Sequence, residues 1–275
     1  MIEMLGTMLS YQFMIRALIV GTLVSLCAAL LGVSLVLKRY SMIGDGLSHV
    51  GFGSLAVATV LGFAPMAFTI PVVVLTAFLL LRLSSQGKLK GDALIAMIST
   101  GALAVGVIVL SLGKGMTSDV NNYLFGSVLA MSDSDVSLSV VLTTIVLITF
   151  IIFYRKIFAV TFDEMFARAV GEKVELYNML LSLLTAITIV LGMRVMGAML
   201  ISSLIIFPAV TAMRLCKSFR SVTICAAIIS VVCYFIGLCC SYVFATPTGA
   251  SVVIVNIVAF LIFWVIRKIK SSVLS

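Results

Sequence analysis

Long apolar runs alternate with short polar connections along the whole chain. A helix needs about 20 apolar residues to cross a bilayer, and by that measure the pattern predicts nine candidate membrane helices. They are 13–37, 43–62, 65–82, 92–112, 136–154, 174–193, 197–214, 222–243 and 249–266. No connection has the composition of a flexible linker. We therefore expect an all-α, polytopic integral membrane protein of about eight or nine transmembrane helices, with a single membrane domain over residues 1–275.

Composition supports this class of protein. The chain is 63% hydrophobic and only 10% charged, whereas a soluble domain has roughly 25% charged residues. The start of the chain lacks the basic segment of a cleavable signal peptide, because Glu3 is the only charge before Arg16. The six cysteines show no C-x-x-C spacing. We interpret them as small packing residues inside helices.

Basic residues predict how the helices are oriented. All but three of the 18 Lys and Arg fall in connections that share one side if the N-terminus lies outside. The exceptions are Arg16, Lys114 and Arg194. This bias follows the positive-inside rule and predicts an outer N-terminus, an inner C-terminus and an odd number of spans. It also accounts for the net charge of +8 without a nucleic-acid partner.

A glycine-rich stretch, SMIGDGLSHVGFG at 41–53, contains the only histidine of the chain, His49, and Asp45 four residues before it. If the stretch is helical, the two side chains share one face, with Cβ atoms about 5–6 Å apart. An imidazole and a carboxylate at that spacing can bind one divalent metal ion. The alternative is structural, with Asp45 capping a helix and His49 donating to a carbonyl. The glycines predict a broken or closely packed helix.

Two connections are too long to be simple loops. The predicted outer one, 113–135, contains Asp119, Asp133 and Asp135, which would attract cations to an outer mouth or belong to an ordinary solvated loop. Its segment 121–131 is apolar but too short to span, and a half-helix is possible there.

The predicted inner connection, 155–173, contains the sequence TFDEMFARAVG. Thr161 and Glu164 have the spacing of a capping box, and Gly171 is a plausible helix stop. The predicted helix of about nine residues carries Phe162 and Phe166 as aromatic anchors. Such a helix suits the membrane surface or a groove on a partner protein, and composition favours neither.

Four stretches together resemble the permease subunits of bacterial ABC importers for zinc and manganese. They are RYSMIGDGLSHVGFG (39–53), AVTFDEMFARAVG (159–171), GMRVMGAMLISSLIIFPAVTAMR (192–214) and TPTGAS (246–251). The similarity runs from about 13 to 263, with the motifs in the family's order.

The resemblance implies a fold related to vitamin B12-type importer permeases and a location in the bacterial plasma membrane. It implies three partners: a second permease copy, an ATP-binding cassette ATPase and an extracytoplasmic metal-binding protein. The family's proposed metal ligands fall on Asp45 and His49. Its coupling helix falls on Thr161, Phe162, Asp163, Glu164, Phe166, Arg168 and Gly171. No cofactor is expected to stay bound, and Zn²⁺ or Mn²⁺ would be the cargo.

The chain has no phosphate loop of the type G-x-x-x-x-G-K-[ST]. ATP hydrolysis is therefore expected in a partner, and the chain itself is expected to be non-catalytic. Gly46 and Val50 around the metal pair resemble the zinc-uptake branch, whereas manganese permeases more often show G-D-A-[IL]-S-H. Zinc is the expected cargo, and manganese or iron is the alternative.

Other function classes fit the sequence less well. An ion-coupled secondary transporter usually keeps several ionisable residues at mid-membrane, and the inner segment 161–171 has no evident role in one. An intramembrane metalloenzyme needs more ligands than a single histidine and a neighbouring carboxylate supply. In a purely structural membrane protein, burying the Asp45 carboxylate in the membrane would cost free energy and serve no function.

Overall fold

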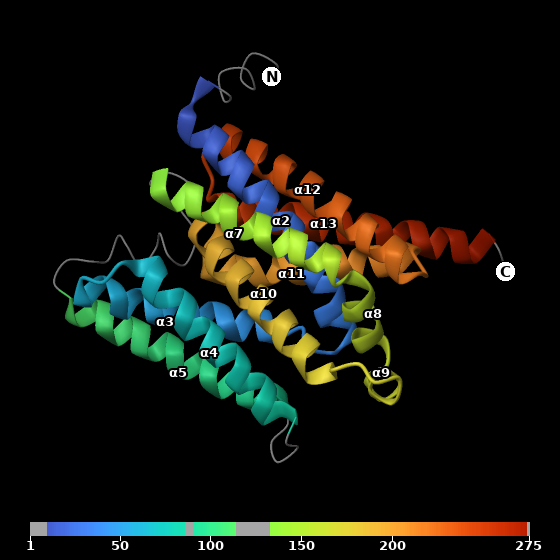
Figure 1. Ribbon diagram of the computed structural model, residues 1–275. Coiled ribbons are helices and arrows are strands. Elements are labelled where there is room, and N and C mark those ends of the chain that lie inside the picture. Colours follow the sequence, from blue (N-terminus) through green and yellow to red (C-terminus); the bar gives the residue numbers. More distant parts are fainter. Residues whose placement is uncertain (1–9, 86–90, 114–132, 274–275) are drawn as a thin grey trace.

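The computed structural model describes residues 10–85, 91–113 and 133–273, and these residues form helices and no strands (Figure 1). The all-α prediction is confirmed. The helices are α2 (Gln12–Leu37), α3 (Ile43–Leu61), α4 (Pro65–Ser85), α5 (Gly91–Leu112), α7 (Asp133–Ile152), α8 (Tyr154–Phe162), α9 (Glu164–Ala169), α10 (Val174–Met196), α11 (Ala198–Leu215), α12 (Phe219–Phe244) and α13 (Thr248–Val273).

Each of the nine predicted spans corresponds to a long helix of the structure. Among the described residues, seven of these helices are long and apolar enough to cross a membrane, and α11 contributes a shorter apolar helix. The remaining one, α3, carries Asp45, His49 and four glycines and is not among the seven. It is continuous over 19 residues, so of the two alternatives for this segment the closely packed helix is correct.

The helices differ in how much of their surface the protein itself covers. Most of α2 and α10 is buried, whereas less than a quarter of α5, α7 and α13 is buried. Figure 1 shows α10 and α11 between two groups of helices: α3, α4 and α5 on one side, and α2, α7, α12 and α13 on the other. The exposed faces of the outer helices are apolar, as expected of a surface that meets lipid tails.

Small residues allow close backbone contact around α2. A Cβ on Gly32 would lie 2.0 Å from the carbonyl oxygen of Ile205 in α11, and one on Gly21 would lie 1.9 Å from the Tyr234 hydroxyl in α12. That hydroxyl donates to the carbonyl of Ala17, 2.7 Å away. Because lipid is as apolar as a leucine side chain, membrane helices associate through this kind of close packing. These contacts fix α2 against α11 and α12.

A glycine crossing also joins α3 to α5. A Cβ on Gly53 would lie 2.5 Å from the carbonyl oxygen of Ala102, and one on Gly106 would lie 3.0 Å from the Cα of Gly53. The obstacle is backbone, which cannot rotate away. We expect Gly53→Ala to separate the two helices and to destabilise the protein by about 1–3 kcal/mol, as overpacking does. Thermal unfolding in detergent measures this as a lowered melting temperature.

Gly101→Ala is the matched control on the same helix pair. A Cβ at Gly101 meets no atom within 4 Å, and alanine is favoured over glycine inside a helix by about 1 kcal/mol. The control protein should melt at or above the temperature of the parent. Equal melting temperatures for Gly53→Ala and the parent would contradict the crossing described here.

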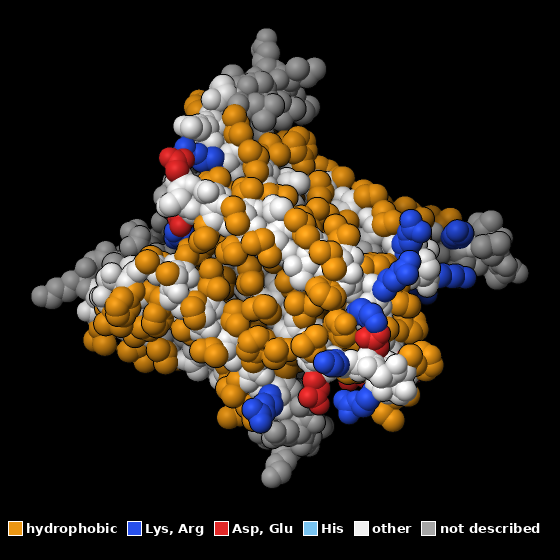
Figure 2. All heavy atoms as spheres, viewed as in Figure 1, with side chains coloured by type: hydrophobic (Ala, Val, Ile, Leu, Met, Phe, Trp, Pro, Cys, Tyr) orange, Lys and Arg blue, Asp and Glu red, His pale blue; other side chains and the backbone are white. Residues whose placement is uncertain are grey.

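One end of the molecule is rich in basic side chains. In Figure 2 apolar side chains cover the middle of this face, and most of the Lys and Arg lie at the end that holds α8, α9 and the C-terminal part of α13. The start of α3 lies toward this end too, because α3 follows α2 through a turn of only five residues. Asp45 therefore belongs to the half of the protein nearer the basic end.

Candidate functional site

The predicted metal pair lies in the first two turns of α3. A tight turn leads into this helix: the backbone N–H of Tyr40 bonds the carbonyl of Leu35, and that of Ile43 bonds the carbonyl of Tyr40. Asp45 occupies the first turn of α3, where a carboxylate is stabilised by the positive end of the helix dipole. Both residues are therefore held by a rigid helix start and not by a loop.

Asp45 and His49 face each other at the predicted spacing. The distance from His49 Nε2 to Asp45 Oδ2 is 3.7 Å, and the two side chains are 12% and 37% exposed, respectively. Two ligand atoms at about 2.1 Å from one tetrahedral ion lie about 3.4 Å apart. The observed separation is close to this value and too long for a strong hydrogen bond. The pair is therefore arranged as two ligands of one ion would be.

The glycines on either side of the pair bring two neighbouring helices close. A Cβ on Gly44 would lie 3.2 Å from Ile205 of α11, and one on Gly46 would lie 2.6 Å from Ile95 of α5. Gly51 instead meets Met193 of α10. At 100° per residue, Asp45 and His49 project between the sides facing α11 and α5, away from α10. Met193 packs on the opposite side of α3, so it is not a third ligand of this pair.

The pair offers two candidate metal ligands from this chain. Among the described residues, no group of three or more His, Cys, Asp and Glu side chains could hold a metal ion. The second ring nitrogen of His49, Nδ1, is buried, and no described group forms a hydrogen bond with it. A two-ligand site binds weakly and releases its ion easily. That property suits a transport site better than a storage or structural site.

The inner helix predicted between Thr161 and Gly171 is present as α9, which is six residues long; a second short helix, α8, precedes it and is joined to it at Asp163. The backbone there is extended, with φ −150° and ψ 99°, and Asp163 Oδ1 accepts a hydrogen bond of 2.9 Å from the N–H of Phe166. The capping box of Thr161 and Glu164 was therefore a wrong prediction. Thr161 lies inside α8 and is buried. Asp163 is the cap because it is the residue directly before α9.

The predicted stop at Gly171 is confirmed. Its φ of +87° is favourable only for glycine, and the N–H of Glu172 bonds the carbonyl of Ala167 across the turn. Arg168 lies in the last turn of α9, where a cation complements the helix dipole. Phe162 and Phe166 are 70% and 65% exposed. The anchors predicted from the sequence are thus free to contact something outside the chain.

Lys38 and Asn178 connect α9 to the rest of the protein, and neither contact was predicted from the sequence. Lys38 Nζ donates to Glu164 Oε1 and to Asn178 Oδ1, each at 2.5 Å. Burial tends to raise the pKa of the Glu164 carboxyl, but the hydrogen bonds and charges of its neighbours, chiefly Lys38, outweigh burial and lower that pKa. Burial lowers the pKa of Lys38. Lys38 had been counted only as one of many inner basic residues.

Two of the three predicted outer carboxylates are paired with arginines. Asp133 and Asp135 lie in the first turn of α7 and not in a loop, a position that the helix dipole favours. Asp133 pairs with Arg16 of α2, and Asp135 lies 2.5 Å from Arg194 of α10. The two arginines were exceptions to the positive-inside pattern. Asp119 and the predicted half-helix 121–131 lie outside the described residues.

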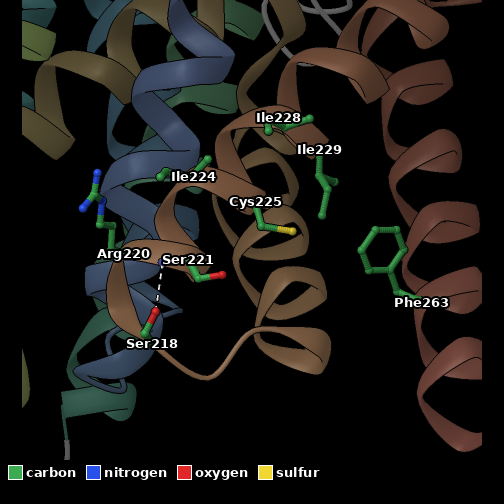
Figure 3. A pocket seen from close by; sticks show the side chains of 8 residues that line it. All are labelled: Ser218, Arg220, Ser221, Ile224, Cys225, Ile228, Ile229 and Phe263. Carbon is green, nitrogen blue, oxygen red and sulfur yellow. Dashed lines mark hydrogen bonds between the residues drawn. The ribbon is translucent and has the colours of Figure 1, made fainter. Parts of the chain in front are cut away.

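The structure also has an open groove of about 480 Å³ between the start of α12 and α13 (Figure 3). Its upper part is apolar, with Ile224, Ile228 and Phe263. At its lower end, Ser218 caps α12 by accepting a hydrogen bond of 3.3 Å from the N–H of Ser221. In Figure 3 Arg220 points away from the ring of Phe263. The groove contains none of the predicted site residues.

The sequence is similar to those of known proteins over nearly its whole length. The manganese import system permease protein ScaB of Streptococcus gordonii is 28% identical over 94% of this chain and 96% of its own length. The high-affinity zinc uptake system membrane protein ZnuB of Haemophilus influenzae is 31% identical over 92% of this chain and 97% of its own. Both are named as subunits of metal uptake systems.

A solved structure agrees with these relatives. PsaBC from Streptococcus pneumoniae, determined in complex with Fab, matches with a TM-score of 0.86 and 28% identity, over 96% of this chain and 95% of that one. The model of the ABC 3 transport family matches residues 10–267, which include the metal pair, α8, α9 and the glycine crossings. The chain therefore belongs to the ABC 3 transport family.

Proposed function

We propose that this protein is the membrane-spanning permease subunit of an ATP-driven importer of divalent transition metal ions, with zinc as its preferred cargo. The observation that carries the proposal is the Asp45–His49 pair, at 3.7 Å on one face of a glycine-packed membrane helix. A carboxylate inside a membrane protein marks a functional site by default. Family membership supplies the transport mechanism into which this pair fits.

In the proposed mechanism the ion passes through the pair while the helices alternate between outward and inward access. An extracytoplasmic protein delivers the ion, and Asp45 and His49 hold it briefly. The ATPase partner binds at the end of α8 and at α9, where Phe162 of α8 and Met165 and Phe166 of α9 are exposed. A second permease copy completes the translocation path. ATP-driven movement of the partner is transmitted through α9.

The choice of zinc rests on ligand chemistry and on the sequence around the pair. A site of one imidazole and one carboxylate binds zinc more tightly than manganese in the general affinity order. Gly46 and Val50 flank the pair as in the zinc-uptake branch. Manganese is the second candidate, because ScaB is named for manganese import.

Growth of a deletion strain in medium depleted of one metal at a time tests the cargo. We expect a strain lacking this protein to stop growing when zinc is depleted and to recover when zinc is added or the gene is restored. The order of affinities predicts a smaller response to manganese. Rescue by manganese, with zinc ineffective, would reassign the cargo and leave the transporter proposal intact. If the deletion strain took up both zinc and manganese as well as the parent strain does, the proposal that this protein is a metal importer would be rejected.

The proposed orientation, N-terminus outside and C-terminus inside, predicts a specific labelling pattern. On a background with the six cysteines replaced, Ser118→Cys should react with a membrane-impermeant reagent in intact cells. Ser85→Cys should react only after the membrane is permeabilised, because it lies in a predicted inner connection. The opposite pattern would reverse every sidedness assignment made above, including the inner position of α9.

A further inference from the structure

A buried lysine joins three elements at the basic end of the protein. Lys38 directly follows α2, and its side chain is only 5% exposed. It donates to Glu164, the first residue of α9, and to Asn178 in α10, and Asn178 Nδ2 donates to the same Glu164 oxygen at 3.2 Å. The three side chains form a closed cycle of hydrogen bonds. Lys38 therefore differs from a solvated lysine that only helps to orient a membrane helix.

The cycle gives α9 a connection that its apolar packing does not supply. The apolar contacts of α9 are made through Ala167, which packs with Val160 of α8 and Val174 of α10. This small cluster links α9 to its neighbours in sequence. Lys38 is the residue through which the described structure ties α9 to α2, 126 residues away in the chain.

Beyond Lys38 the chain passes into α3 through a tightly bonded turn. Arg39 has a positive φ of 61°, and the N–H groups of Arg39 and Tyr40 bond the carbonyls of Val36 and Leu35. This is the pattern of a Schellman motif, here with an arginine at the position that usually holds glycine. Asp45 follows seven residues after Lys38. Lys38 therefore lies at the start of a tightly bonded turn that leads to the first turn of α3, which holds Asp45.

We propose that Lys38 is a positioning residue that couples movement of α9 to the turn carrying Asp45 and His49. The inference rests on the proposed function, because it assigns α9 to the ATPase contact. Directional hydrogen bonds from one ammonium keep α9, α2 and α10 in fixed register, whereas apolar contacts are non-directional and permit sliding. When the partner pulls or pushes α9, the start of α3 moves with it.

The variant Lys38→Met tests this in the complete complex of permease and ATPase, reconstituted in liposomes. Methionine keeps the apolar part of the side chain, and the Glu164 that remains is 46% exposed, so water can solvate it. We expect the ATPase to stay bound and to hydrolyse ATP. The zinc transported per ATP should fall by about tenfold, within the range by which coupling residues act.

Lys156→Met is the matched control. Lys156 pairs with Glu172 at the same end of the molecule, but its side chain is 46% exposed. Surface pairs of this kind contribute little, so the zinc transported per ATP should stay near the parent value. If the Lys38→Met permease does not fold, as judged by size-exclusion chromatography, Glu164→Gln removes the charge of the other partner and should give the same loss. An unchanged ratio in the variant used, or loss of the ATPase from the complex, would overturn the proposal.

A second measurement does not depend on metal transport. Met42 lies in the turn before α3 and is 51% exposed, so Met42→Cys reports on this turn through its rate of thiol labelling. On a cysteine-free background we expect ATP to change this rate in the parent complex but not with Lys38→Met. An equal ATP response in both would overturn the coupling role. ATP-dependent labelling without zinc or manganese uptake would instead contradict the proposed function and leave the coupling role standing.

Discussion

Replacing His49 with alanine is expected to reduce metal uptake to the level of vesicles without transporter. The proposed site has two ligands from this chain, and the change removes the only imidazole. Loss of a residue that merely orients a ligand costs about 10–100-fold in metal affinity, so loss of a ligand should cost at least that much. Asp45→Asn should have a similar effect. Uptake of radioactive zinc into liposomes with the reconstituted complex measures both.

Ser48→Ala is the control beside the pair. The Ser48 hydroxyl donates to the carbonyl of Asp45 in its own helix, so its loss leaves both proposed ligands in place. We expect near-normal uptake, and all three variants should elute from size-exclusion chromatography as the parent does. Normal transport by the His49→Ala protein would reject the ligand assignment.

The second large effect is expected from Phe166→Asp. Phe166 is 65% exposed, so the change should leave the fold of the permease intact. An aromatic anchor at the centre of an interface typically contributes 2 kcal/mol or more, which is a loss of roughly 30-fold or more in affinity when it is removed. We expect the ATPase to dissociate during purification, or to hydrolyse ATP without driving uptake. Co-purification and coupled uptake assays distinguish these two results.

Phe63→Asp is the matched control for Phe166→Asp. Phe63 is 54% exposed and lies in the turn between α3 and α4, at the end of α3 opposite to Asp45. Its substitution should leave the ATPase bound. A stable and fully coupled complex containing Phe166→Asp would show that α9 rests on the membrane surface and is not the main contact with the partner.

The sequence by itself determined the helices and the placement of Asp45 and His49 on one helix face, because both depend on local spacing. An apolar run of about 20 residues is sufficient to predict a membrane helix, and all nine predicted runs are helical. Asp45 and His49 share one face because an i, i+4 pair does so on any α-helix. The stop at Gly171 was also predictable, because glycine is the usual residue at a left-handed helix end.

Local sequence patterns did not decide which residue caps α9 or whether Asp133 and Asp135 lie in a loop or in a helix. Thr161 and Asp163 are both good caps, and only the direction of the backbone after α8 determines which of them starts α9. Asp133 and Asp135 had been placed in a loop because polar residues end an apolar run, yet acidic residues are favoured in a first helical turn. In both cases two rules applied to the same few residues.

The contacts that tie α9 to α2 and α10 depend on tertiary structure alone. Lys38 meets Glu164 and Asn178 across 126 and 140 residues of sequence, and Asp135 meets Arg194 across 59. Helical spacing carries no information about such partners, because they are chosen by how whole helices pack. The glycines of α2, α3 and α5 set that packing by letting backbones approach. Glycine-rich sequence thus predicted close contact at α3, and only the structure decided which side chains it brought together.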